Sequence, residues 1–248
     1  MEKPLVSVIM PAYNAEKYIA QSIDSVVKQS YQNWELLITD DRSNDNTQEI
    51  VKQYSNQDSR IKLFVNKENG GAGVARNNSI KQAKGRFIAF LDADDQWLPE
   101  KLIKQIAIMQ KNNYAFTFTA YQKVEGNEKK AIITPPKYTT YRKLLGGNVI
   151  GCLTAIYDTE VLGKKYMPLI RKRQDMGLWL NILKDVERAY CLNEALALYR
   201  VDSGMTQDKL EILKWQWLFY RKEMKLSVMM TSYYFAIYCY NALLKYLK

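Results

Sequence analysis

The chain has 248 residues, with 36 lysines and arginines against 26 aspartates and glutamates, which gives a formal net charge of +10. That length accommodates one large domain, or one domain with a small appendage. The basic surplus favours partners that carry phosphate or anionic lipid, although a solvated lysine-rich surface explains it equally well. Because histidine is absent, acid–base chemistry falls to Asp, Glu, Lys or Tyr, and any metal site must be oxygen-rich, which favours Mg²⁺ or Mn²⁺.

The three cysteines, Cys152, Cys191 and Cys239, are far apart and odd in number, which argues against a disulfide framework or a zinc site and predicts a reducing, cytoplasmic location. The apolar run at residues 5–10 has the length of a strand rather than of a signal peptide. The uncharged segment 226–244 has nearly the length of a membrane span, but its four tyrosines weaken that interpretation.

Short apolar runs alternate with amphipathic segments through the first half of the chain. Strands are predicted at residues 6–10, 34–39, 61–65, 87–91 and 116–121. Helices are predicted from a cap at Asn14 through residues 18–27, from Asn44 or Asp45 to Tyr54, from the loop 69–73 to about Ala83, and from Pro99 to about Gln110. This alternation predicts a mostly parallel sheet covered by helices on both faces, which binds ligands at the carboxyl ends of its strands.

The pattern changes after residue 121. Gly126-Asn127 lies between two extended runs and predicts a hairpin, and residues 148–157 contain a further strand. A short helix is predicted at 175–183. From Lys209 onward the chain reads as one or two helices rich in Trp, Tyr, Met and Lys.

Polar segments stand where the predicted strands end: Pro11-Ala-Tyr-Asn14, Asp40-Asp-Arg-Ser43, the loop that carries Arg76, and Asp92-Ala-Asp-Asp95. In an extended segment Asp92 and Asp94 point to the same side, so they can hold a divalent cation or divide the work between a metal and a ribose. The alternative is an acidic loop that caps the following helix through Asp94 or Asp95. The position directly after a buried strand favours the metal site.

The glycine-rich loop Gly70-Gly-Ala-Gly73 does not fit a dinucleotide fingerprint. Arg76 stands where the third glycine belongs, and the loop follows the third predicted strand rather than the first. A P-loop is excluded because no Gly-Lys-Ser/Thr follows.

Taken together, the segments 8–14, 40–45, 69–77, 83–95 and Leu98-Pro99 resemble glycosyltransferase family 2 in order and spacing. The resemblance is strong over residues 4 to about 120 and weaker over 145–205. It implies a GT-A fold, a nucleotide-sugar donor and inversion at the anomeric carbon. Carried over by position, the resemblance implies that Pro11, Ala12 and Tyr13 line the uracil and ribose and that Asp41 accepts from the uracil ring nitrogen. It also implies that Arg76 lies near the nucleotide and that Asp92 and Ala93 lie by the ribose. Asp94 is the implied ligand of Mn²⁺ or Mg²⁺.

An inverting transfer needs a carboxylate that takes the proton from the acceptor hydroxyl. The segment 173–179 resembles the family's base-carrying segment, so Asp175 is the predicted base; a helix N-cap is the alternative role, and both can hold at once. Asp158 and Glu160 are weaker candidates. The segment 199–204 also resembles the family, with Asp202 in place of a frequent histidine, so Asp202 is a possible additional metal ligand. Arg200 either pairs with the diphosphate or is an ordinary loop residue.

The basic and aromatic tail suggests contact with the membrane interface, because aromatic rings suit the headgroup level and cations suit anionic lipid. Packing on the domain or on a second subunit is the alternative, and a spanning helix comes third. The expected parts are a nucleotide-sugar-binding half at 1–120, an acceptor-binding and catalytic half at 121–208, and the helical tail at 209–248. No nucleic-acid motif accompanies them.

The predicted function is inverting, metal-assisted transfer of a sugar from a nucleotide-diphosphate sugar, with UDP favoured, to a glycan or lipid-linked acceptor at the cytoplasmic membrane face. A catalytically silent nucleotide-sugar-binding or scaffold subunit is the alternative, and a homo-oligomer is possible. A nucleotidyltransferase fits less well, because Pro11-Ala-Tyr-Asn14 is not its glycine-rich basic loop.

Overall fold

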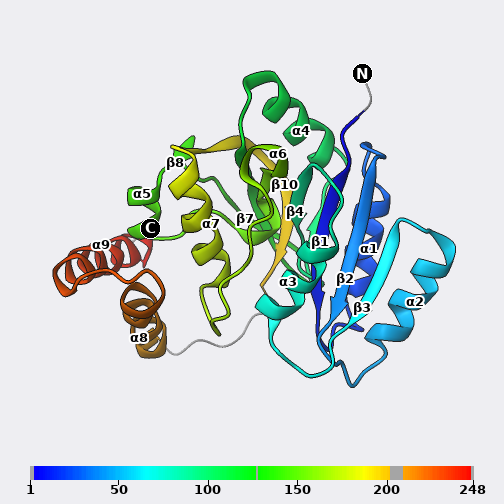
Figure 1. The fold of residues 1–248 in the computed structure, drawn as a ribbon, viewed down its shortest axis with the longest axis horizontal. Coiled ribbons are helices and arrows are strands. Elements are labelled where there is room, and N and C mark those ends of the chain that lie inside the picture. The colour runs from blue at the N-terminus through cyan, green and yellow to red at the C-terminus, as the bar shows by residue number, and fades with distance from the viewer. Residues whose placement is uncertain (1–2, 127, 202–208, 247–248) are drawn as a thin grey trace.

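The computed structural model describes residues 3–126, 128–201 and 209–246, and its centre is one large β-sheet (Figure 1). The strands are β1 (Val6–Ala12), β2 (Trp34–Asp40), β3 (Ile61–Val65), β4 (Phe87–Phe90), β5 (Gln96–Trp97), β6 (Phe116–Glu125), β7 (Glu128–Ile133), β8 (Tyr138–Thr139), β9 (Ile156–Asp158) and β10 (Ala189–Arg200). The five strands predicted in the first half are all present.

The strand order is β3-β2-β1-β4-β9-β6-β10-β5, with β7 paired to β6 and β8 paired to β10. β1 pairs in parallel with β2 and β4, β2 with β3, and β6 with β10, whereas β9 is antiparallel to both of its neighbours. The mostly parallel sheet is therefore confirmed. The predicted hairpin is also present, because Glu125 of β6 pairs with Glu128 of β7.

Helices cover both faces of this sheet (Figure 1). They are α1 (Ile19–Val27), α2 (Thr47–Gln57), α3 (Ala72–Gln82), α4 (Lys101–Asn112), α5 (Tyr141–Leu145), the 3-10 turn η1 (Cys152–Thr154), α6 (Thr159–Leu162), α7 (Gln174–Asp185), α8 (Lys209–Leu218), the π-helical turn η2 (Phe219–Glu223) and α9 (Val228–Tyr246).

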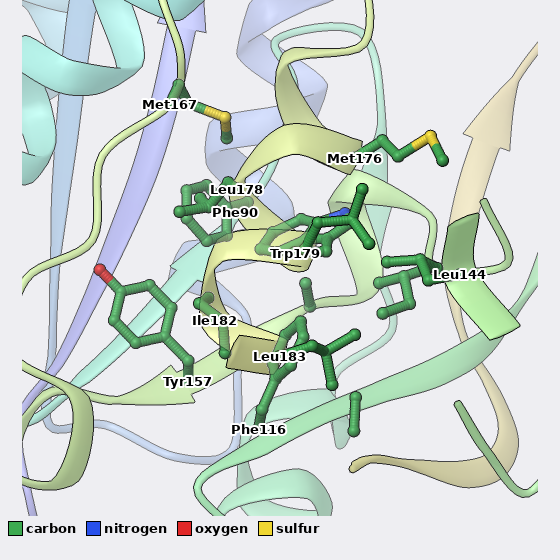
Figure 2. Packing of buried hydrophobic residues seen from close by; sticks show 14 of the residues in the cluster. Phe90, Phe116, Leu144, Tyr157, Met167, Met176, Leu178, Trp179, Ile182 and Leu183 are labelled. Carbon is green, nitrogen blue, oxygen red and sulfur yellow. The ribbon is translucent and has the colours of Figure 1, made fainter. Parts of the chain in front are cut away.

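Side chains of alternate residues in the central strands pack into two separate hydrophobic cores, one on each face of the sheet. In β4, Phe87 and Ala89 pack with apolar residues of α1, α2 and α4, whereas Ile88 and Phe90 face α3 and α7 on the other side. A strand with apolar residues on both faces is what a parallel sheet covered on both sides requires. Figure 2 shows the second core, in which the edge of Trp179 meets the ring of Phe90 at a centroid distance of 5.3 Å.

Three helix starts differ from the predictions. Asn14 does not cap α1, which begins five residues later after Tyr18; Asn14 instead adopts φ +48° in a loop. α2 begins at Thr47 rather than at Asn44 or Asp45, although Asp45 Oδ1 does accept from the N–H of Thr47 (3.0 Å). Pro99 precedes α4, because its carbonyl oxygen is engaged by the N–H of Ser30 (2.9 Å). At Asn14 and Pro99, bonds to residues distant in the chain stand in place of the predicted helix bonds.

The C-terminal helices pack on the domain. Phe219, Tyr220 and Tyr234 are buried members of the same core as α5 and α7, and the ring of Trp217 meets that of Phe235 edge-on at 5.3 Å. Packing on the domain, the alternative to membrane contact, is therefore present on one side of the tail, because its aromatic rings complete a core. Membrane contact through the rest of the tail stays a prediction. Among residues 3–126, 128–201 and 209–246, no helix is both long enough and apolar enough to cross a lipid bilayer.

Candidate active site

The loops after β1 and β2 are joined by hydrogen bonds in both directions. The N–H of Asn14 donates to Ser43 Oγ (2.9 Å), and the side-chain oxygen of Asn14 accepts from the N–H of Asn44 (2.8 Å). Pro11 and Ala12 are buried as the last residues of β1. Tyr13 follows them and is 50% exposed. An aromatic ring is thus presented at the carboxyl edge of the sheet, where a nucleotide base can stack.

Asp41 organises the glycine-rich loop. It is 2% exposed, and its carboxylate accepts from the N–H of Gly70 (3.0 Å), the N–H of Gly71 (2.6 Å) and the side-chain amide of Asn66 (2.7 Å). Gly71 has a backbone φ of +83°, a conformation that residues other than glycine rarely adopt. The loop that precedes α3 is therefore shaped by the carboxylate that the sequence assigns to the base of the nucleotide.

A partly buried ion pair lies at the centre of this edge. Arg76 of α3, 8% exposed, donates through Nη2 to Asp92 Oδ1 (2.5 Å) and through Nη1 to Gln174 Oε1 of α7 (3.4 Å). Burial alone lowers the pKa of Arg76, but the charges of Asp92 and of Asp175 outweigh it and raise that pKa. The guanidinium therefore stays charged between two carboxylates that come from opposite halves of the chain.

Asp175 is the second residue of α7 and not its N-cap, which is Arg173. Its Oδ2 accepts from the side-chain amide of Asn148 (2.9 Å). Burial raises the pKa of the Asp175 carboxyl and the charge of Asp92 raises it further, whereas the positive charges of Arg76 and Arg173 lower it, with a raised pKa as the net result. A carboxylate whose pKa is raised toward neutral pH is better matched to the work of a general base.

Arg200, the last residue of β10, binds the acidic loop that consists of residues 92–95. Its N–H donates to Asp95 Oδ1 (2.9 Å), and its Nε donates to the carbonyl oxygen of Asp94 (3.1 Å). The guanidinium carbon lies 4.2 Å from the ring centroid of Tyr18, and Nη2 donates to Gln21 Oε1 (3.1 Å). Arg200 thus holds the loop in place, and its predicted pairing with a diphosphate stays a prediction.

Negative charge accumulates along the acidic loop. Burial raises the pKa of Asp95 well above its ordinary value, and the charges of Asp92 and Asp94 raise it further, with Arg200 opposing. A divalent cation beside Asp94 would relieve this repulsion, and carboxylate oxygens are ligands that suit Mg²⁺ or Mn²⁺. Within the described part of the chain, no group of three or more acidic or cysteine side chains could hold a metal ion by itself.

This geometry can be compared with known proteins. The family model described as "Glycosyl transferase family 2" matches residues 7–157. The chain belongs to glycosyltransferase family 2. It is 43% identical over 246 residues to the putative teichuronic acid biosynthesis glycosyltransferase TuaG of Bacillus subtilis, with 98% of each chain covered. It is 46% identical over 220 residues to WfgD of Escherichia coli, named as a UDP-Glc:alpha-D-GlcNAc-diphosphoundecaprenol beta-1,3-glucosyltransferase, with 88% of this chain and 85% of WfgD covered.

A solved structure gives the same result for the fold. S. aureus TarS, residues 1–349 in complex with UDP, superposes with a TM-score of 0.70 at 25% identity, over 94% of this chain and 70% of TarS. The fold is GT-A, and this family 2 member is a glycosyltransferase. The alternatives of a silent scaffold subunit and of a nucleotidyltransferase are set aside.

The structure also sorts the remaining candidates in this glycosyltransferase. Asp158 pairs in register with Phe87 at the start of β4, the opposite end from Asp92, and its carboxylate binds Arg86 (2.8 Å). Glu160 also pairs with Arg86 (3.0 Å), so neither acid reaches the site. Asp202 lies outside the described residues.

Two residues of the site were missed by the sequence analysis. Asn148 and Gln174 each bind a charged group of the site, Asp175 and Arg76 respectively. Gln174 is adjacent to Asp175 and could have been suspected on that ground. Asn148 gave no signal, because an Asn after two glycines is typical of an ordinary turn.

Proposed function

We propose that this glycosyltransferase moves a sugar, with inversion, from a UDP-sugar to a hydroxyl group of a lipid-linked glycan acceptor, with Asp175 as the general base. The single observation that carries the proposal is the position of Asp175 at the start of α7, with a raised pKa and with the charges of Arg76 and Asp92 acting on it. UDP is favoured because TarS binds it and because the name of WfgD specifies UDP-Glc.

In this mechanism the donor lies along the carboxyl edge of the sheet. Tyr13 and Asp41 receive the base, and the Arg76–Asp92 pair lies by the ribose. A divalent cation at Asp94, with Asp202 as a possible further ligand, would neutralise charge on the diphosphate as it leaves. Arg200 holds the acidic loop that carries Asp94.

The transfer itself is a single displacement. Asp175 takes the proton of the acceptor hydroxyl as that oxygen attacks the anomeric carbon from the face opposite the diphosphate. The new glycosidic bond forms while the bond from the anomeric carbon to the diphosphate oxygen breaks, and UDP leaves with that electron pair. Asn148 fixes the carboxylate through the 2.9 Å bond to its Oδ2.

The acceptor class rests on WfgD, whose name specifies a diphosphoundecaprenol-linked sugar. An enzyme with such an acceptor works at a membrane surface, and we place this one at the cytoplasmic face, in peripheral contact through its basic tail. The division into a donor half at 1–120, an acceptor half at 121–208 and a tail at 209–248 is part of the same proposal.

The test is the variant Asp175→Asn in a UDP-release assay with a diphosphoundecaprenol-linked sugar acceptor. We expect turnover to fall by about 10³-fold, because a positioned base contributes about 10²–10⁴-fold. The affinity of Asp175→Asn for UDP, measured by thermal shift, should equal that of the unchanged protein both with and without Mn²⁺. The matched control is Asp185→Asn, which removes an exposed carboxylate from the far end of α7. Unchanged turnover in Asp175→Asn would place the base elsewhere, and UDP binding that ignores Mn²⁺ would contradict the cation at Asp94.

A further inference from the structure

A groove runs between α5 and α9, on a part of the surface that none of the donor-site residues line. Its volume is about 710 Å³, within the range of small-molecule sites. One wall is basic and comes from α5, and the other is apolar and aromatic and comes from α9; its lining includes Arg142, Lys143, Met230, Tyr233, Ile237 and Asn241.

The walls of the groove are fixed by close packing. Gly146, the residue after α5, allows α9 to approach, because a Cβ atom there would stand 2.9 Å from a methyl carbon of Ile237. The side-chain amide of Asn241 donates to the carbonyl oxygen of Gly146 (2.9 Å), and the hydroxyl of Tyr220 donates to the carbonyl oxygen of Leu145. The groove is therefore a built feature of the fold rather than a gap between loosely placed helices.

Among the residues that the structure describes, the basic wall has no acidic counterpart. Arg142 and Lys143 are exposed, and neither has a carboxylate within 4.0 Å among the ion pairs of the described residues. Lys143 instead stands 4.2 Å from the ring centroid of Tyr138. Adjacent cations of this kind are suited to a phosphate or diphosphate group.

The apolar wall continues beyond the groove along α9. Exposed residues Met229, Tyr233, Tyr240 and Leu243 follow one another at helical spacing, and Met229 is 81% exposed. A contiguous apolar track of this kind marks an interaction surface. Because it begins at a pair of cations, the ligand that fits both is an amphiphile with an anionic head and a hydrocarbon chain.

The groove also adjoins the proposed base. Gly146 precedes Asn148 by two residues, which span at most about 7 Å, and Asn148 binds the carboxylate of Asp175. On the other side, Nη2 of Arg173 donates to the hydroxyl of Tyr238 in α9 (2.8 Å). A head group held at Arg142 and Lys143 would thus have its attached sugar next to the start of α7.

We propose that this groove binds the diphosphate and the first isoprenyl units of the lipid-linked acceptor, with Arg142 and Lys143 on the diphosphate and α9 along the chain. The inference rests on the proposed function and adds a site for the anchor of the acceptor. A second copy docked on the same track would bring the same cations to the interface without acidic partners for them, so charge favours the anionic lipid.

The test measures the affinity of farnesyl diphosphate for the full chain by calorimetry, with UDP present at saturation so that the donor site is occupied. The variants are Arg142→Ala/Lys143→Ala for the cations and Met230→Glu for the apolar wall; all three side chains are exposed, so folding should be retained. The control is Lys28→Ala/Lys52→Ala, which removes two exposed, ion-paired cations, one just after α1 and one in α2, on the opposite flank (Figure 1).

We expect each groove variant to lose about tenfold or more in affinity and the control to match the unchanged protein. Arg142→Ala/Lys143→Ala removes hydrogen bonds to a charged group, and Met230→Glu places a negative charge on the apolar wall. Inorganic diphosphate at the same concentration should not compete, because it lacks the chain. Equal affinity in all proteins would overturn the inference. Vesicles of phosphatidylglycerol that bind as tightly as farnesyl diphosphate would overturn it and assign the groove to the general membrane surface. A dimer that only Met230→Glu dissociates, with the affinity for farnesyl diphosphate unchanged, would assign the groove to a second copy of the chain. UDP binding by the unchanged protein tests the proposed function separately.

Discussion

At the scale of single residues, the site depends on how a few neighbours set the charge state of Asp175. The side-chain amide of Asn148 is one of them, because it donates to the deprotonated carboxylate at 2.9 Å. The burial of Asp175 acts in the opposite direction and raises its pKa. The balance between these effects decides how much of the base is available at a given pH.

The variant Asn148→Asp should therefore shift the acid limb of the pH–rate profile. It removes the donor and adds a negative charge, and both changes raise the pKa of Asp175. Activity requires the deprotonated carboxylate, so it is lost as the pH falls through that pKa. We expect the acid limb to move to higher pH by about one unit. Asn148→Ala, which removes only the donor, should give a smaller shift, and identical profiles for all three proteins would contradict the role of Asn148.

Lys101 is a second residue whose environment decides its charge. It is fully buried in α4, its Nζ donates to Gln105 Oε1 (2.9 Å), and it lies 4.3 Å from the ring centroid of Trp97. Burial lowers its pKa well below the ordinary value of 10.5. Below pH 10.5 the unfolded chain therefore binds a proton that the folded protein holds less tightly.

This difference predicts a pH-dependent contribution to stability. Because the unfolded state binds more protons, this lysine raises the free energy of unfolding as the pH rises from its lowered folded-state pKa toward 10.5, with a slope of at most about 1.4 kcal/mol per pH unit. Urea titrations of the unchanged protein and of Lys101→Met should show that slope only in the former. Lys111→Met, at an exposed position of the same helix, is the control. Equal slopes in the unchanged protein and Lys101→Met would mean that Lys101 is charged in the folded state.

At the scale of secondary-structure elements, α9 docks against the C-terminal end of α5. This contact depends on Gly146, whose missing side chain leaves room for Ile237. The buried rings of Phe219, Tyr220 and Tyr234 add to the same core, so the tail is part of the domain and not an appendage.

The variant Gly146→Ala should consequently destabilise the protein by about 1–3 kcal/mol, because it overpacks the contact with Ile237. The double variant Gly146→Ala/Ile237→Ala should recover part of that loss relative to the sum of the two single variants. Thermal unfolding of the four proteins measures this coupling. Strictly additive stability losses for the two single variants would show that residues 146 and 237 do not interact sterically.

At the scale of the whole molecule, the net charge of +10 is the dominant property of the surface. A basic protein is drawn to anionic membranes by a field that salt screens, with a Debye length of about 10 Å at 0.1 M. The exposed apolar residues of α9 would add a contribution that salt does not weaken.

Sedimentation with phosphatidylglycerol vesicles should accordingly fall several-fold between about 0.05 and 0.5 M NaCl, and phosphatidylcholine vesicles should retain little protein at either concentration. Such a result supports peripheral contact through the basic surface. Retention that is equal on both lipids would instead assign the contact to apolar residues alone.

The sequence by itself determined the five strands of the first half and the polar segments that follow them. β1 to β4 are short runs of apolar residues, and such runs report burial whatever their partners are. Asp41, Asp92 and Asp94 could be placed at one edge because parallel strands end together. The helix starts at Asn14 and Asn44 were wrong, because both residues bind across the two loops rather than within a helix.

The tertiary structure alone decided the contacts between residues that are distant in the chain. Asn148 meets Asp175 across 27 residues, Asn241 meets Gly146 across 95, and Arg76 meets Gln174 across 98. No local pattern encodes such pairs, because they depend on which faces of two packed elements come together. For the same physical reason the sequence left membrane contact and packing as alternatives for the aromatic tail. Amphipathic composition indicates that one side is covered, and the packed fold shows that the domain core covers part of it.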